Sequence, residues 1–203
     1  MSYIVHASGY LARARARLNE RTQEGLFYAT LELRSGIESR MHEYLEARED
    51  IANRKKHGYQ VAKLAKGLER VFAAGEKVVR LRGIDEYGRP MWEVYFTPVR
   101  ARLRKHAARL GDYLHGNQLQ RPDDDPWWTE FRSFLNEVVE ELDFACSGTL
   151  MGPPLLEKKT NRMSIVVQVD HTDPIGAQLT RKGDSVVLQV EYLDDYSPAA
   201  TAA

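Results

Sequence analysis

The sequence predicts an α+β protein that is mostly α: an up-and-down helical bundle with an inserted β-hairpin, followed by a small C-terminal antiparallel β unit. Through most of the first 150 positions, apolar residues recur at three- and four-residue steps, the period of amphipathic helices. Residues within 77–96, 163–169 and 186–192 instead alternate apolar and polar side chains, as strands do. A Gly-Pro-Pro stretch at 152–154 marks a boundary. We therefore expect a bundle over residues 1–150, a β unit over 151–196 and a disordered tail over 197–203.

Three helices are predicted before the hairpin. Ser8 can cap the first, which runs to about residue 20. The second spans residues 22–48, and a basic stretch at 53–58 separates it from the third, which Gly75 stops. The apolar rows are Leu11, Ala14 and Leu18, then Leu26, Ala29, Leu33, Ile37, Met41 and Tyr44, then Val61, Leu64, Leu68, Val71 and Phe72.

The hairpin is predicted over about residues 77–96, because a turn-forming stretch at 85–90 separates two apolar runs. Thr97 with Pro98 then predicts the start of a helix that ends at His115, before Gly116. A second cap-plus-proline pair, Asp125 with Pro126, starts the last helix. Side chains expected in the core are Leu33, Ile37, Leu68, Leu103, Leu110, Phe131, Leu135 and Val138. In the C-terminal β unit, alternating runs at 163–169 and 186–192 flank a turn that contains Gly183.

Composition excludes several classes of protein. The 29 basic and 29 acidic side chains cancel, so any role with nucleic acid depends on a local basic patch. Cys146 is the only cysteine, which excludes a disulfide framework or a thiolate zinc cluster. The Arg-rich N-terminus lacks the apolar core of a signal peptide, and no run approaches the length of a membrane span. We expect a cytoplasmic protein with no membrane association.

Familiar catalytic motifs are also missing from the sequence. It contains no glycine-rich phosphate loop, no His-Glu-x-x-His helix and no Gly-x-Ser-x-Gly elbow. None of the six histidines is spaced from another histidine, a cysteine or a carboxylate in a way that by itself indicates a metal site. We expect neither a metal nor another cofactor.

One helix, over residues 98–116, is densely basic. Its candidate phosphate contacts, given the charge of the nucleic-acid backbone, are Arg100, Arg102, Arg104, Lys105, His106 and Arg109. The alternative is a solvated face whose arginines pair with the acidic faces of neighbouring helices.

His115 is the most distinctive residue of this helix. It closes the helix where the negative end of the macrodipole favours a protonated imidazole. Arg109 lies six positions earlier, about 120° around the axis and roughly 9 Å along it, so the two side chains cannot simply touch. Both can line one cleft, especially if a second copy contributes across a dimer axis. The alternative is that His115 only caps the helix end.

The stretch Arg109-Leu-Gly-Asp-Tyr-Leu-His115-Gly116, with an arginine followed by a histidine at a helix end, resembles the HEPN family of helical bundles. The charged segment at residues 31–38 is similar to an early helix of such bundles. The resemblance covers at most residues 20–147, and Leu110 departs from the polar residue that usually follows the arginine. It implies a homodimeric, metal-independent endoribonuclease of a toxin or phage-defence type, with Arg109 and His115 catalytic. Many members of the family are non-catalytic.

Three hypotheses follow. In the first, His115 moves protons, Arg109 stabilises the phosphorane and the other basic residues of the helix hold RNA. This requires Arg109 and His115 to face one groove. In the second, a non-catalytic dimeric bundle binds a protein or nucleic-acid partner, and His115 is packed or isolated. The third is a small-molecule sensor that uses Trp92, Tyr95 and Trp127.

Overall fold

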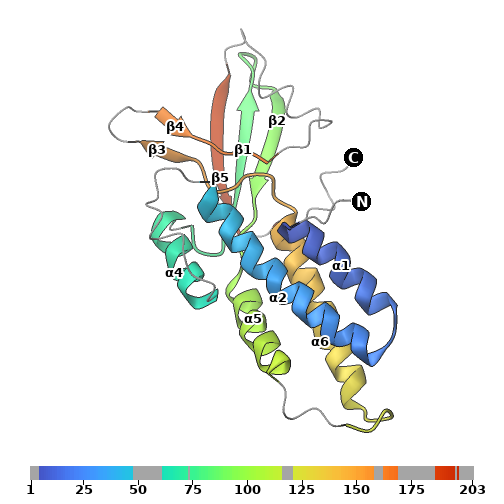
Figure 1. The fold of residues 1–203 in the computed structure, drawn as a ribbon. Helices are drawn as coiled ribbons and strands as arrows, with labels where there is room; N and C mark the ends of the chain where they lie inside the picture. Colours follow the sequence, from blue (N-terminus) through green and yellow to red (C-terminus); the bar gives the residue numbers. More distant parts are fainter. Residues whose placement is uncertain are drawn as a thin grey trace. The chain divides into compact units, whose positions relative to one another are not determined.

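The structure is a computed structural model that describes residues 5–47, 61–72, 74–115, 121–157, 162–168, 186–194 and 196. Five helices and five strands lie in this part of the chain, which confirms the predicted α+β class (Figure 1). The chain divides into two compact units. We call Met1–Leu68 with Val99–Cys146 the helical unit, and Glu69–Pro98 with Ser147–Ala203 the sheet unit.

The helical unit is built around the 24-residue helix α2 (Gln23–Glu46), which packs against α1 (Ala7–Asn19), α5 (Ala101–Leu114) and α6 (Trp127–Cys146) (Figure 1). A further helix, α4, spans Val61–Phe72. Seven of the eight predicted core side chains are buried: Leu33, Ile37, Leu103, Leu110, Phe131, Leu135 and Val138. The eighth prediction was wrong, because Leu68 is only half-buried on α4.

Two of the predicted helix starts were wrong. His6 caps α1 in place of Ser8, and its Nδ1 accepts the backbone N–H of Gly9 at 3.3 Å. The α5 helix begins after Arg100. The Thr97 hydroxyl is not free to cap it, since it accepts the buried N–H of Gly148 at 3.0 Å.

The predicted start of α6 is confirmed, and so is the end of α5. The Asp125 carboxylate accepts the backbone N–H of Trp127 at 2.9 Å, as an N-terminal cap does. His115 is the C-cap of α5, and its backbone N–H donates to the carbonyl of Gly111 at 3.2 Å. Gly116 lies outside the described residues.

The sheet unit contains the predicted hairpin, formed by β1 (Val78–Ile84) and β2 (Pro90–Phe96). The C-terminal strand β5 (Val187–Leu193) pairs antiparallel with β1, giving the strand order β2-β1-β5. Two short strands, β3 (Leu155–Glu157) and β4 (Arg162–Ser164), pair separately. The expected strand residue Val169, the Gly183 turn and the tail at 197–203 lie outside the described residues.

The face of the sheet that carries β1's arginines has its charges paired across strands. Arg80 is paired with Glu191 of β5, and Arg82 with Glu93 of β2 at 3.1 Å. On the other face, Trp92 lies over Gly83, where an added Cβ would come within 2.3 Å of the indole. The glycine is therefore required by the tryptophan that packs across it.

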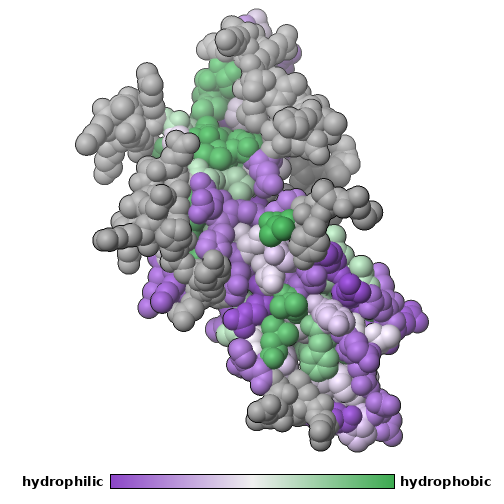
Figure 2. Space-filling view, viewed as in Figure 1, coloured by the Kyte–Doolittle hydropathy of each residue, from purple (hydrophilic) through white to green (hydrophobic). Residues whose placement is uncertain are grey.

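Most of the surface of the helical unit visible in Figure 2 is hydrophilic, with a smaller apolar area among the polar residues. Tyr28 and Leu31, three residues apart on α2, are 57% and 52% exposed. Residues three apart on a helix are neighbours on its surface. This pair is therefore an apolar patch on the outer face of α2.

We predict that Leu33→Ala or Leu135→Ala lowers the free energy of unfolding by about 2–5 kcal/mol, because each truncation leaves a cavity around a fully buried position. Leu68→Ala serves as the matched control and should cost less, since Leu68 is half-buried. Urea unfolding of the three variants measures this. Equal losses at all three positions would contradict the helix packing.

Candidate nucleic-acid interface

Helix α5 has one buried and one solvent-facing side. Leu103, Ala107 and Leu110 are buried against the other helices. Arg102, Lys105 and Arg109 are exposed. Steps of three and four residues place these three cations on one strip, which we call the outer face of α5. The folding pattern that buries the apolar row thus determines where the cations point.

The other three candidate contacts have structural partners of their own. Arg104 donates to the carbonyl of Val99 at 2.8 Å, next to the start of α5. The Arg100 guanidinium lies 3.9 Å from the centre of the Phe144 ring. The ring of His106 makes an edge contact with Phe134, with ring centroids 5.2 Å apart.

Arg102 fits the alternative interpretation from the sequence, in which the arginines pair with acidic neighbours. It is paired with Glu137 at 2.9 Å and with Glu141 at 3.6 Å, both on α6. With both partners in place the Arg102 side chain is still 60% exposed, so the pairs contribute little to stability and a phosphate can compete for the guanidinium. Among the described residues, neither Lys105 nor Arg109 has an acidic partner of this kind.

Arg109 is exposed but held in place by aromatic side chains. Its guanidinium lies 4.1 Å from the centre of the Phe134 ring, and its Nε donates to the Tyr113 hydroxyl at 3.0 Å. A guanidinium flat on a ring keeps the donors at its edge available while losing little further freedom on binding. Sequence reasoning missed both aromatic residues. The i,i+4 spacing could have identified Tyr113, but nothing local indicates Phe134.

His115 is exposed at the end of α5. It is one turn after Gly111, and a Cβ added at Gly111 would meet the Arg34 guanidinium of α2. Arg109 instead reaches Phe134 of α6. Within one chain, the predicted catalytic pair therefore lies on two different sides of α5.

The aromatic residues of the sensor hypothesis pack within their own units. Trp127 stacks on Phe131, with centroids 4.7 Å apart, in the helical unit. Tyr95 stacks on Tyr196 at 4.4 Å in the sheet unit. These contacts give each ring a packing role, which leaves the basic face of α5 as the stronger candidate site.

No group of three His, Cys, Asp or Glu side chains suited to a metal ion occurs in the described ranges. Within the same ranges, no helix has both the length and the apolar character needed to cross a membrane.

No protein-family model, curated protein or solved structure matches the chain. The class of site is therefore defined by geometry alone: an exposed basic helix face on a helical unit, supported by Phe134 of α6 and by Tyr113 of α5 itself.

We predict that protonation of His106 destabilises the folded protein. Burial, aided by the positive charges of Arg102 and Arg109 and opposed by Glu137 and Glu141, lowers the pKa of His106. The folded state favours the neutral ring. The contribution of His106 to the free energy of unfolding is therefore fully present above the ordinary histidine pKa of about 6.5, and it is lost as the pH falls through the folded-state pKa. Between pH 7.5 and pH 5, the melting temperature of wild type should therefore fall further than that of His106→Gln. Equal losses in both proteins would show that His106 does not carry this dependence.

Proposed function

We propose that this chain binds RNA through the outer face of α5. The observation that carries the proposal is the strip of Arg102, Lys105 and Arg109, exposed on one side of a single helix in a chain whose total charge is zero. Contacts to phosphates supply most of the sequence-independent affinity for nucleic acid. Arginines also stack on unpaired bases, which is a common mode of RNA recognition.

The support of Arg109 by aromatic side chains strengthens the proposal. Phe134 and Tyr113 hold the guanidinium in one orientation before any ligand arrives. A pre-oriented donor group loses less side-chain entropy on binding than a free one. The non-catalytic alternative with a protein partner would use the same face, and competition with RNA would reveal it.

We predict that the double variant Lys105→Ala/Arg109→Ala binds single-stranded RNA at least about tenfold more weakly than wild type. The slope of log affinity against log salt concentration should become shallower by about 1.4, since each lost phosphate contact on a single strand contributes about 0.7 to that slope. Fluorescence anisotropy with a labelled RNA oligomer measures both. Arg15→Ala/Arg17→Ala is the matched control, because it removes two exposed arginines that are ion-paired on α1. Equal effects in both variants would argue against an interface on α5.

A second candidate function is metal-independent RNA cleavage by a homodimer, as the family resemblance implies. The observation that favours it is His115, a side chain able to accept and donate a proton that is exposed at the C-terminal end of α5. One histidine would take the proton of the RNA 2′-hydroxyl as its oxygen attacks the phosphorus. A protonated one would give its proton to the leaving 5′ oxygen, while Arg109 stabilises the phosphorane.

Because Arg109 and His115 lie on different sides of α5, this mechanism needs the His115 of a second copy. The exposed Tyr28 and Leu31 of α2 provide apolar surface for such an association. Binding by one chain has no such requirement, which makes RNA binding the better-supported function. A role in toxicity or phage defence depends on this second candidate.

If the chain is a nuclease, we expect His115→Ala to abolish RNA cleavage in the presence of a chelator, with the melting temperature nearly unchanged because the side chain is exposed. Arg109→Ala should also abolish cleavage. Light scattering at micromolar concentration should give the mass of a dimer. A monomer, or cleavage that survives His115→Ala, would eliminate this second candidate and leave the binding proposal intact.

A further inference from the structure

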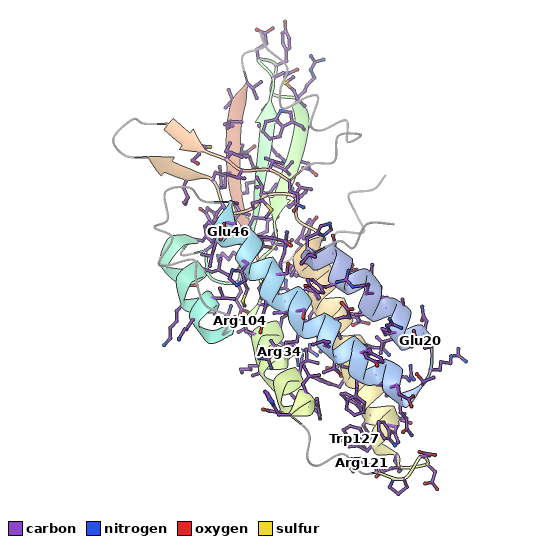
Figure 3. All side chains as sticks on the ribbon, in the orientation of Figure 1. Glu20, Arg34, Glu46, Arg104, Arg121 and Trp127 are labelled. Atoms are coloured by element: carbon purple, nitrogen blue, oxygen red, sulfur yellow. The ribbon has the colours of Figure 1, made fainter. Side chains whose placement is uncertain are left out.

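A second basic group, separate from the outer face of α5, lies where α5 meets α2: Arg34 of α2 and His115 at the end of α5. A Cβ built on Gly111 would lie 2.0 Å from Nη1 and 3.1 Å from Cζ of Arg34. The Arg34 guanidinium therefore rests directly on the backbone of α5, in the volume that any other side chain at position 111 would fill. Figure 3 labels Arg34 on α2, the helix that packs against α5.

Only one end of this guanidinium is engaged. Its Nε donates to Glu38 at 3.3 Å, a long bond within α2. Among the described residues, Glu38 is the only hydrogen-bond or ion-pair partner of Arg34, and the arginine side chain remains 32% exposed. The Glu38 carboxylate thus holds the guanidinium at its Nε and leaves the Nη groups over Gly111.

His115 follows on the same side of α5. Its backbone N–H still donates to the Gly111 carbonyl, so helical geometry continues to this residue. Side chains four residues apart on a helix have Cβ atoms about 5–6 Å apart. The exposed His115 ring therefore starts one turn from the position that the Arg34 guanidinium occupies, a span that one tetrahedral anion can bridge. The small side chain of Ala108, also exposed on this side, leaves the approach open.

We propose that Arg34 and His115 form an anion site across the α2–α5 edge, which takes a phosphate of the RNA backbone. This inference rests on the proposed RNA binding and adds a second contact on a different side of α5 from Arg109. A guanidinium offers paired N–H donors that match phosphate oxygens, and a ring N–H of the His115 imidazole adds another. Two carboxylates are nearby: Glu38, turned to Nε, and Asp112, exposed next to Gly111 in sequence. Neither is paired with the Nη groups.

The test uses Gly111→Ala, which displaces Arg34 without removing any charge, and Arg34→Gln, which removes the charge. Inorganic phosphate is the probe, and the NMR signals of the His115 ring report its binding. In wild type we expect these signals to shift with saturation. In either variant the response should weaken about tenfold or more, the loss expected for a charge-assisted contact. The double variant should be no weaker than Arg34→Gln alone, because both changes act through one guanidinium.

Arg109→Gln is the matched control and should leave the phosphate response intact, since Arg109 lies toward α6. The proposal is overturned if phosphate leaves the wild-type His115 signals unmoved, or if Arg34→Gln responds like wild type. If Gly111→Ala fails to fold, Arg34→Gln alone decides. RNA affinity that depends on Lys105 and Arg109 but not on Arg34 would also overturn the site, while the proposed function would stand. A phosphate response without RNA binding would keep the anion site and reject RNA as its ligand.

Discussion

The helical unit depends on one buried charge, the guanidinium of Arg40. It donates to the carbonyl of Ala145 at the end of α6 at 2.9 Å, and to Glu43 on α2 at 2.9 Å. Glu43 also accepts the backbone N–H of Ala7, at the start of α1, at 2.6 Å. A buried charge is tolerated only when it is fully paired, so this network fixes how α1, α2 and α6 meet at one end. Burial also raises the pKa of the neighbouring Cys146 thiol to about 12, which makes it unreactive.

Once α2 and α6 are fixed, α5 lies between them, and each of the two helices places a side chain against it. From α6, Phe134 supports Arg109 on the outer face. From α2, Arg34 crosses onto the backbone of α5 at Gly111. The packing that holds the helix in place thus also prepares a cationic group on each of its sides. The RNA binding that we propose would then require little rearrangement, because both guanidinium groups are already oriented.

Charges elsewhere in the described parts of the chain are more often neutralised. On the sheet, Arg80 and Arg82 of β1 pair with Glu191 and Glu93 of the flanking strands. On α1, the outward-facing arginines pair with acidic residues, as Arg15 does with Asp143. The outer face of α5 differs, since Lys105 and Arg109 have no such partner there. A protein with zero total charge can in this way present a local basic surface.

The sequence by itself determined the elements: the periods of the helices, the hairpin, the Asp125 cap and the end of α5 at His115. These follow from interactions within about four residues, which local patterns record. Only the tertiary structure decided what the side chains meet. Thr97 does not cap α5, because its hydroxyl accepts the backbone N–H of Gly148. Strand β5 pairs with β1 although about a hundred residues separate them in the sequence. The tertiary structure also brought Phe134 of α6 against Arg109 and Arg34 of α2 over Gly111, because these two side chains come from helices whose packing no local pattern specifies.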